Sequence, residues 1–75
     1  MISHDYFMDK ETMRQIGQAL WELRRDKRLQ LHHVSTQAKI PENILERMEI
    51  GRNMPYGTLR KLLNFYGKSI RISIE

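Results

Sequence analysis

The sequence predicts an all-α domain of four to five short helices that ends in a short β-strand. Apolar residues recur at spacings of three and four from Met13 to Tyr66, which is typical of one face of a helix. This pattern is interrupted at residues 28–29, 39–40 and 51–55, and the last interruption contains a glycine and a proline. In residues 68–75 the apolar positions alternate instead, which indicates a strand.

Composition favours one small binding domain. The chain has 75 residues, and a chain of this length buries only about 60% of its unfolded surface, which leaves little material for a catalytic cleft. We divide it into an N-terminal arm (residues 1–9), a helical domain (10–67) and a C-terminal strand (68–75). Thirteen Lys and Arg against nine Asp and Glu give a net charge of +4, which favours polyanionic partners.

Cysteine is absent, which is typical of a reducing compartment. The first residues lack a basic segment followed by a long apolar one, and no stretch approaches the length of a membrane span. We therefore expect a cytoplasmic protein with no membrane partner.

The first helix is predicted to begin after Asp9, a favourable N-cap, and to run to about Lys27. Its inward stripe is Met13, Ile16, Leu20 and Leu23. Trp21 lies off this stripe. It is expected either to be covered by the N-terminal arm or to contact a partner.

The next two helices form a corner. Leu31, Val34 and Ala38 line a short second helix, the turn falls at residues 39–40, and Pro41 is placed where a third helix begins. Two helices joined by so short a turn form a helix-turn-helix motif, whose second helix enters the major groove of DNA.

Most side chains on the outer face of the third helix can read bases. Asn pairs with adenine, Arg with guanine, Glu with the amino group of cytosine, and Ile with the methyl group of thymine. The alternative is an ordinary solvated helix face. The outer face is predicted to consist of Glu42, Asn43, Ile44, Glu46 and Arg47.

The spacing of core and turn residues resembles that of the Cro and lambda-repressor type helix-turn-helix proteins, also called the XRE family. The resemblance covers residues 20–67 and implies a lambda-repressor-like fold and a transcription regulator, either an autorepressor or antitoxin-like. The matching positions are Leu20, Leu23, Arg24, Leu29, Val34, Ile40, Leu45, Met48, Glu49, Gly51, Arg52, Pro55, Thr58, Leu59 and Leu62.

The resemblance implies roles for individual residues. Arg24 and Glu49 correspond to a buried ion pair between the first and third helices, and Arg52 and Asn53 to phosphate contacts after the third helix. Lys39, on the other side of that helix, is also assigned to a phosphate.

Three positions depart from the family pattern. Gln30 replaces a Ser or Thr N-cap, Leu31 replaces a Gln that commonly anchors a phosphate, and Lys39 replaces a turn Gly. A positive φ at Lys39 would cost roughly 1 kcal/mol.

The last helix is predicted from about Gly57 to Tyr66, burying Leu59, Leu62, Leu63 and Tyr66 and stopping at Gly67. The strand that follows carries Ile70, Ile72 and Ile74 on one face. A single strand needs a partner, which is either residues 2–7 or the same strand of a second copy. Related proteins often dimerise through such a strand.

The expected function is a sequence-specific regulator that binds palindromic double-stranded DNA as a homodimer, with a toxin or other protein as a further partner. The alternative is a degenerate helix-turn-helix that serves as a protein-protein interaction module. No enzyme activity, cofactor or metal is expected. His32 and His33 are adjacent on a helix and point about 100° apart, so they cannot chelate one ion.

Overall fold

The computed structural model describes residues 9–67, which fold into four helices connected by short turns. They are α1 (Lys10–Asp26), α2 (Leu31–Ala38), α3 (Glu42–Glu49) and α4 (Tyr56–Phe65). Within residues 9–67 there is no strand, so this part of the chain is all-helical, as predicted. The predicted C-terminal strand with Ile70, Ile72 and Ile74, and most of the N-terminal arm, lie outside the described residues.

Local chemistry accounts for the helix ends. The Asp9 carboxylate accepts a hydrogen bond from the Thr12 backbone N–H at 2.7 Å and so caps α1. Lys39 ends α2 in the left-handed region (φ 60°, ψ 48°), which a lysine adopts only at a modest cost in free energy. Arg28, in the turn after α1, also has a positive φ of 56°.

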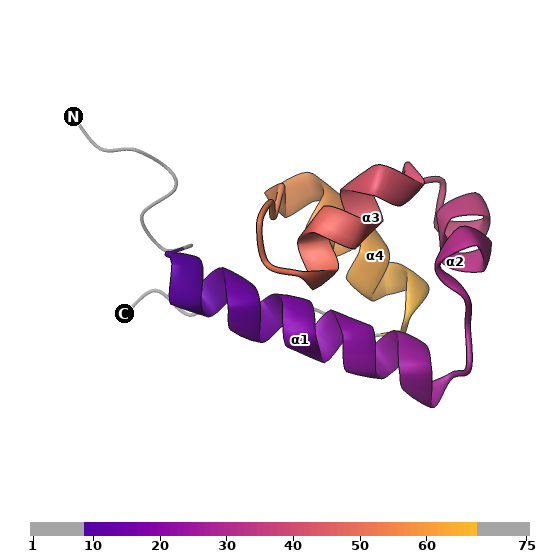
Figure 1. Cartoon of the computed structure of the whole chain (residues 1–75). Helices are drawn as coiled ribbons and strands as arrows, with labels where there is room; N and C mark the ends of the chain where they lie inside the picture. The colour runs from indigo at the N-terminus through magenta and orange to yellow at the C-terminus, as the bar shows by residue number, and fades with distance from the viewer. Residues whose placement is uncertain (1–8, 68–75) are drawn as a thin grey trace.

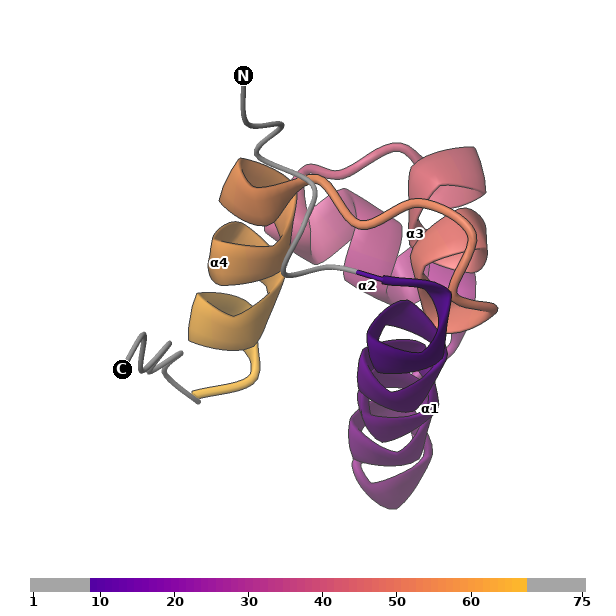
Figure 2. The same cartoon turned by 90° about the vertical axis from the view of Figure 1, so that its left-hand side faces the viewer.

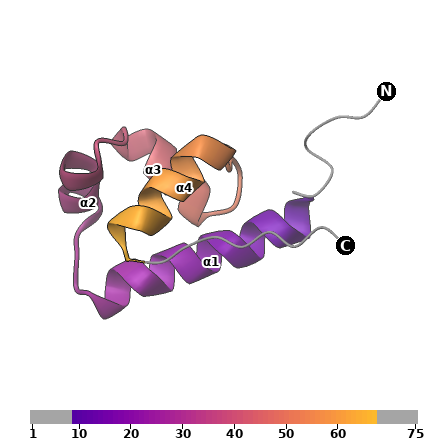
Figure 3. The same cartoon turned by 180° about the vertical axis from the view of Figure 1, so that it is seen from behind.

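The three shorter helices lie on one side of α1, which runs along the whole domain (Figure 1). α3 contacts both α1 and α2, and α2 also contacts α4. The view turned by 90° separates α3 from α4, which lie on opposite sides of the domain (Figure 2). From behind, α4 covers α3 (Figure 3). One side of α3 therefore faces the core, and the other is left open to solvent.

All four helices contribute to one apolar core. Two of its members, Ile40 and Met54, come from the turns before and after α3. Leu63, predicted to be buried, is only half-buried and packs at the edge of the core. Within residues 9–67 the buried hydrophobic side chains are Leu20, Val34, Ala38, Ile40, Leu45, Met48, Met54, Leu59, Leu62 and Tyr66.

Two glycines bring α1 close to the C-terminal end of α3. A Cβ at Gly17 would lie 2.5 Å from the Met48 carbonyl oxygen and 2.6 Å from that of Glu49. Gly51 has a φ of 79°, and a Cβ there would lie 2.7 Å from the Cα of Arg14. Because these contacts are with backbone atoms, a larger residue at Gly17 or Gly51 would push α1 away from α3.

Candidate nucleic-acid interface

The solvent-exposed side of α3 is polar. Glu42, Asn43, Glu46 and Arg47 are all exposed, whereas Leu45 and Met48 on the opposite side are fully buried. At about 100° per residue, the four exposed side chains span roughly 140° of the helix circumference. α3 therefore offers one continuous polar face.

Ile44 does not belong to this face, contrary to the prediction. It is half-buried and packs against the core. The reason is its position four residues before Met48, which places both on the same side of the helix. That spacing is visible in the sequence and would have indicated an inward position. A contact between Ile44 and a thymine methyl is therefore not supported.

The polar face has two edges of different chemistry. Glu42 and Glu46 are four residues apart and follow one edge, while Asn43 and Arg47 follow the other. The acidic edge lies beside α2, since the Nδ1 atom of His32 is 3.8 Å from a carboxylate oxygen of Glu42. Asn43 and Arg47, whose side-chain types can donate hydrogen bonds to purines, thus share one edge, apart from the two glutamates.

Cationic residues flank α3 at both ends. Arg52 is exposed and Asn53 half-buried in the turn after α3, and the Arg52 N–H donates to the Arg47 carbonyl at 2.9 Å. Before α3, exposed Lys39 is joined by Lys61 of α4, whose Nζ donates to the Lys39 carbonyl at 3.0 Å. Sequence reasoning missed Lys61, because its proximity to Lys39 depends on how α4 packs against α2.

Arg24 and Glu49 form the interhelical ion pair expected from the sequence. Arg24 Nε donates to Glu49 Oε2 at 2.7 Å and Nη2 donates to Oε1 at 2.9 Å, so the contact is bidentate. The side chains are only 18% and 8% exposed. The hydrogen bonds to Glu49 raise the pKa of Arg24, and partial burial opposes that shift. A third bond, from Nη1 to the Leu29 carbonyl at 3.1 Å, ties the turn after α1 to the pair.

Tyr66 lies near this pair. Burial raises the pKa of its hydroxyl to about 12, and the negative charge of Glu49 adds to the increase while Arg24 opposes it. The hydroxyl has no hydrogen-bond partner among residues 9–67. A buried, neutral aromatic hydroxyl therefore lies within electrostatic range of the ion pair.

Two further positions bear on the predictions. Leu31, at the start of α2, packs against the core as a half-buried apolar residue, so α2 begins without a phosphate-binding side chain at this position.

Trp21 is 37% exposed, and the guanidinium of Arg25 stacks 4.6 Å from its ring centroid. A cation therefore covers part of the Trp21 ring. The predicted cover, the N-terminal arm, falls almost wholly outside the described residues.

Searches with the chain match no protein-family model, no curated protein and no solved structure. Among residues 9–67, every helix is too short or too polar to cross a membrane.

Proposed function

We propose that this protein is a sequence-specific DNA-binding regulator of the helix-turn-helix class with a lambda-repressor-like domain. The proposal rests chiefly on α3, which follows α2 after a short turn and exposes Asn43 and Arg47 along one edge. An eight-residue helix is about 12 Å long, comparable with the roughly 12 Å width of the major groove. Asn43 and Arg47 would then contact bases, and the flanking residues would contact phosphates.

The charge of α3 limits its own affinity for DNA. It carries three carboxylates and one arginine, and only Glu49 is neutralised by an interhelical partner. Glu42 and Glu46 would repel nearby phosphates unless they accept a hydrogen bond from cytosine. Attraction to the backbone must therefore come from outside α3, mainly from Arg52 and Lys39 with Lys61, and binding should depend steeply on salt.

We expect Asn43→Ala and Arg52→Ala to weaken DNA binding in different ways. Loss of a base contact at Asn43 should cost about 1 to 3 kcal/mol, chiefly at one base pair. Loss of a phosphate contact at Arg52 should weaken all sequences alike and lower the slope of log K against log salt by about 1. Mobility-shift titrations at two salt concentrations, against the DNA upstream of its own gene and against unrelated duplexes, would measure both effects.

Matched controls are available on α1. Gln18→Ala removes an exposed amide and Arg25→Ala removes an exposed guanidinium, and neither residue belongs to α3 or to the turns that flank it. Neither should change DNA affinity by more than about 0.5 kcal/mol. If Asn43→Ala and Arg52→Ala behave like these controls, α3 is not the DNA-reading helix.

We also propose that two copies bind a palindromic site, because one short helix touches too few base pairs to be selective. Two half-sites would lie about 34 Å apart, one turn of the duplex. Ile70, Ile72 and Ile74 would supply the dimer interface, at about 1.5 to 3 kcal/mol for each fully buried side chain before the cost of association.

Deletion of residues 69–75 should give a folded helical monomer with much weaker operator binding. The ten apolar residues that are buried within residues 9–67 form a core among themselves, so the helical signal in circular dichroism should persist after the deletion. Sedimentation velocity would report the oligomeric state. A full-length chain that is monomeric at about 100 μM would contradict the interface and would favour pairing of the strand with residues 2–7.

The second candidate function is a protein-interaction module derived from the same motif, with a toxin or another protein as its partner. It is favoured by the apolar side chain of Leu31 where a phosphate anchor is expected, and by the acidic edge of α3. The two functions differ in salt dependence. DNA binding through several phosphates should fall steeply between about 50 and 200 mM salt, and an apolar protein contact should not.

A further inference from the structure

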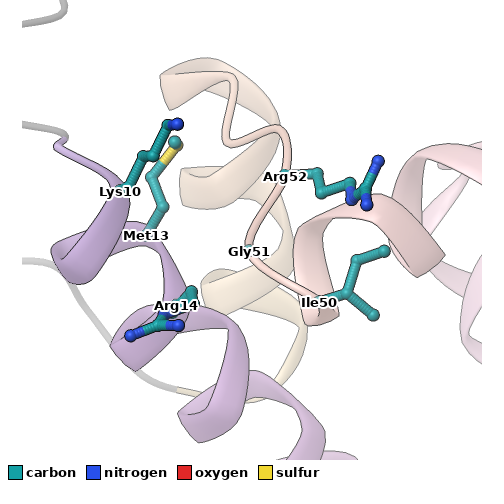
Figure 4. Close-up of a pocket in the computed structure, with 6 residues that line it drawn as sticks. All are labelled: Lys10, Met13, Arg14, Ile50, Gly51 and Arg52. Atoms are coloured by element: carbon teal, nitrogen blue, oxygen red, sulfur yellow. The ribbon is translucent and has the colours of Figure 1, made fainter.

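An open depression lies between the N-terminal half of α1 and the turn after α3 (Figure 4). Its volume is about 430 Å³. It is lined by Lys10, Met13, Arg14, Ile50, Gly51 and Arg52.

Both sides of the depression carry cationic and apolar side chains. Lys10 and Met13 extend side by side from α1, while Ile50 and Arg52 project from the turn that carries Gly51 (Figure 4). The α1 side thus carries two cations, Lys10 and Arg14, with Met13, and the turn carries one cation, Arg52, with Ile50. Ile50 is 55% exposed, more than any other large hydrophobic residue in the described part of the chain. A single exposed isoleucine is ordinary on a protein surface. Ile50 differs in its position, because it lines a depression together with three cationic side chains, Lys10, Arg14 and Arg52.

The charge around the depression is positive. None of its lining residues is acidic. Arg14 binds Glu11 at 2.6 Å, but both side chains are more than 60% exposed, so this pair is weak and can be exchanged for another carboxylate. Lys10 and Arg52 form no ion pair with any of residues 9–67. The surface therefore attracts anionic groups both at α1 and at the turn, beside the apolar side chains of Met13 and Ile50.

We infer that this depression binds an acidic peptide segment of a protein partner, with a bulky apolar side chain flanked by carboxylates. The carboxylates would bind Lys10 and Arg52, and the apolar side chain would contact Ile50 and Met13. Duplex DNA is the competing occupant, because phosphates could also bind the cations. A peptide fits better, since a sugar-phosphate backbone offers no bulky apolar group to cover Ile50.

Arg52 connects this surface to the DNA-binding function proposed above. Its guanidinium cannot bind a phosphate and a carboxylate of the partner at the same time. The acidic segment and DNA would therefore compete. The depression itself is described by the structure independently of DNA binding, so it can be tested whether or not the DNA proposal holds.

The experiment is a selection of random displayed peptides of about twelve residues on the immobilised full-length chain. The pool is first depleted on the double variant Lys10→Glu, Ile50→Ser. Recovered sequences should combine several Asp or Glu with a bulky apolar residue. Synthesised as fluorescent peptides, they should bind Lys10→Glu and Ile50→Ser at least about tenfold more weakly than the unmodified chain in anisotropy titrations.

Arg25→Glu and Tyr56→Ser are the matched controls. Arg25→Glu makes the same change of charge at the other end of α1, and Tyr56→Ser removes another exposed apolar side chain. Both should leave peptide affinity within about twofold, and circular dichroism melts should show that all four variants fold.

Three results would overturn the inference. The first is the absence of peptides that distinguish the chain from the double variant. The second is recovery of peptides that lack acidic residues. The third is a Lys10→Glu variant that keeps its affinity for the peptides but lowers the salt dependence of DNA binding as much as Arg52→Ala does. That result would assign the depression to the nucleic-acid interface. A DNA-binding defect in Asn43→Ala alone would bear on the DNA proposal and leave this one intact.

Discussion

Glu49→Ala is expected to destabilise the domain by about 3 kcal/mol, because it leaves the Arg24 guanidinium partly buried without its carboxylate. Both side chains are largely buried, and the contact has two hydrogen bonds of 2.7 and 2.9 Å. Urea denaturation followed by circular dichroism would give the change in the free energy of unfolding. The double substitution Arg24→Ala, Glu49→Ala should cost less than the sum of the single ones.

Glu11→Ala provides the comparison on the surface. It removes the partner of Arg14, which is also held at 2.6 Å but is well exposed to water. Its cost should be about 0 to 1 kcal/mol. Equal losses for Glu11→Ala and Glu49→Ala, or strictly additive losses for Arg24→Ala and Glu49→Ala, would mean that the interhelical pair acts as two independent surface charges.

Gly17→Ala should destabilise the domain by about 2 kcal/mol, although alanine is the better helix former. The new methyl group would lie within 2.6 Å of two backbone carbonyls of α3, and neither can move without shifting the helix. Overpacking of this kind costs about 1 to 3 kcal/mol, more than the gain in helix propensity. Thermal and urea unfolding would both report the loss.

Gly57→Ala is the same substitution in an open position of α4, where a Cβ meets nothing within 4 Å. It should stabilise the domain by up to about 1 kcal/mol, since it reduces the conformational freedom of the unfolded chain. A stabilising Gly17→Ala would show that α1 is free to move away from α3. The change in the free energy of unfolding should therefore have opposite signs for Gly17→Ala and Gly57→Ala. This comparison tests whether close packing outweighs helix propensity at Gly17.

The helices could be predicted because their signals are local. The stripe from Met13 to Leu23, the Asp9 cap and the break at Lys39 each depend on residues a few positions apart, and the structure has helix ends within about two residues of the expected ones. The pair of Arg24 and Glu49 could be named before the fold was known, through the resemblance of the surrounding spacing to a known family.

The rest depends on contacts between distant segments. Met54 follows no helical stripe, yet it is buried because the turn after α3 folds over the core. Lys61 joins Lys39 only through the packing of α4 on α2. The depression beside Ile50 likewise needs α1 and the turn after α3 to meet, and their positions along the chain are almost forty residues apart. Spacing within one helix contains no information about such contacts.

The close approaches at Gly17 and Gly51 and the ion pair at Glu49 all join α1 to the same end of α3. The C-terminal end of α3 and the facing turns of α1 are therefore packed too closely to shift independently without breaking these contacts. Both sides of the depression adjoin this tightly packed junction. A ligand would meet a preorganised surface and would lose little free energy in ordering it, so even a short peptide could bind measurably.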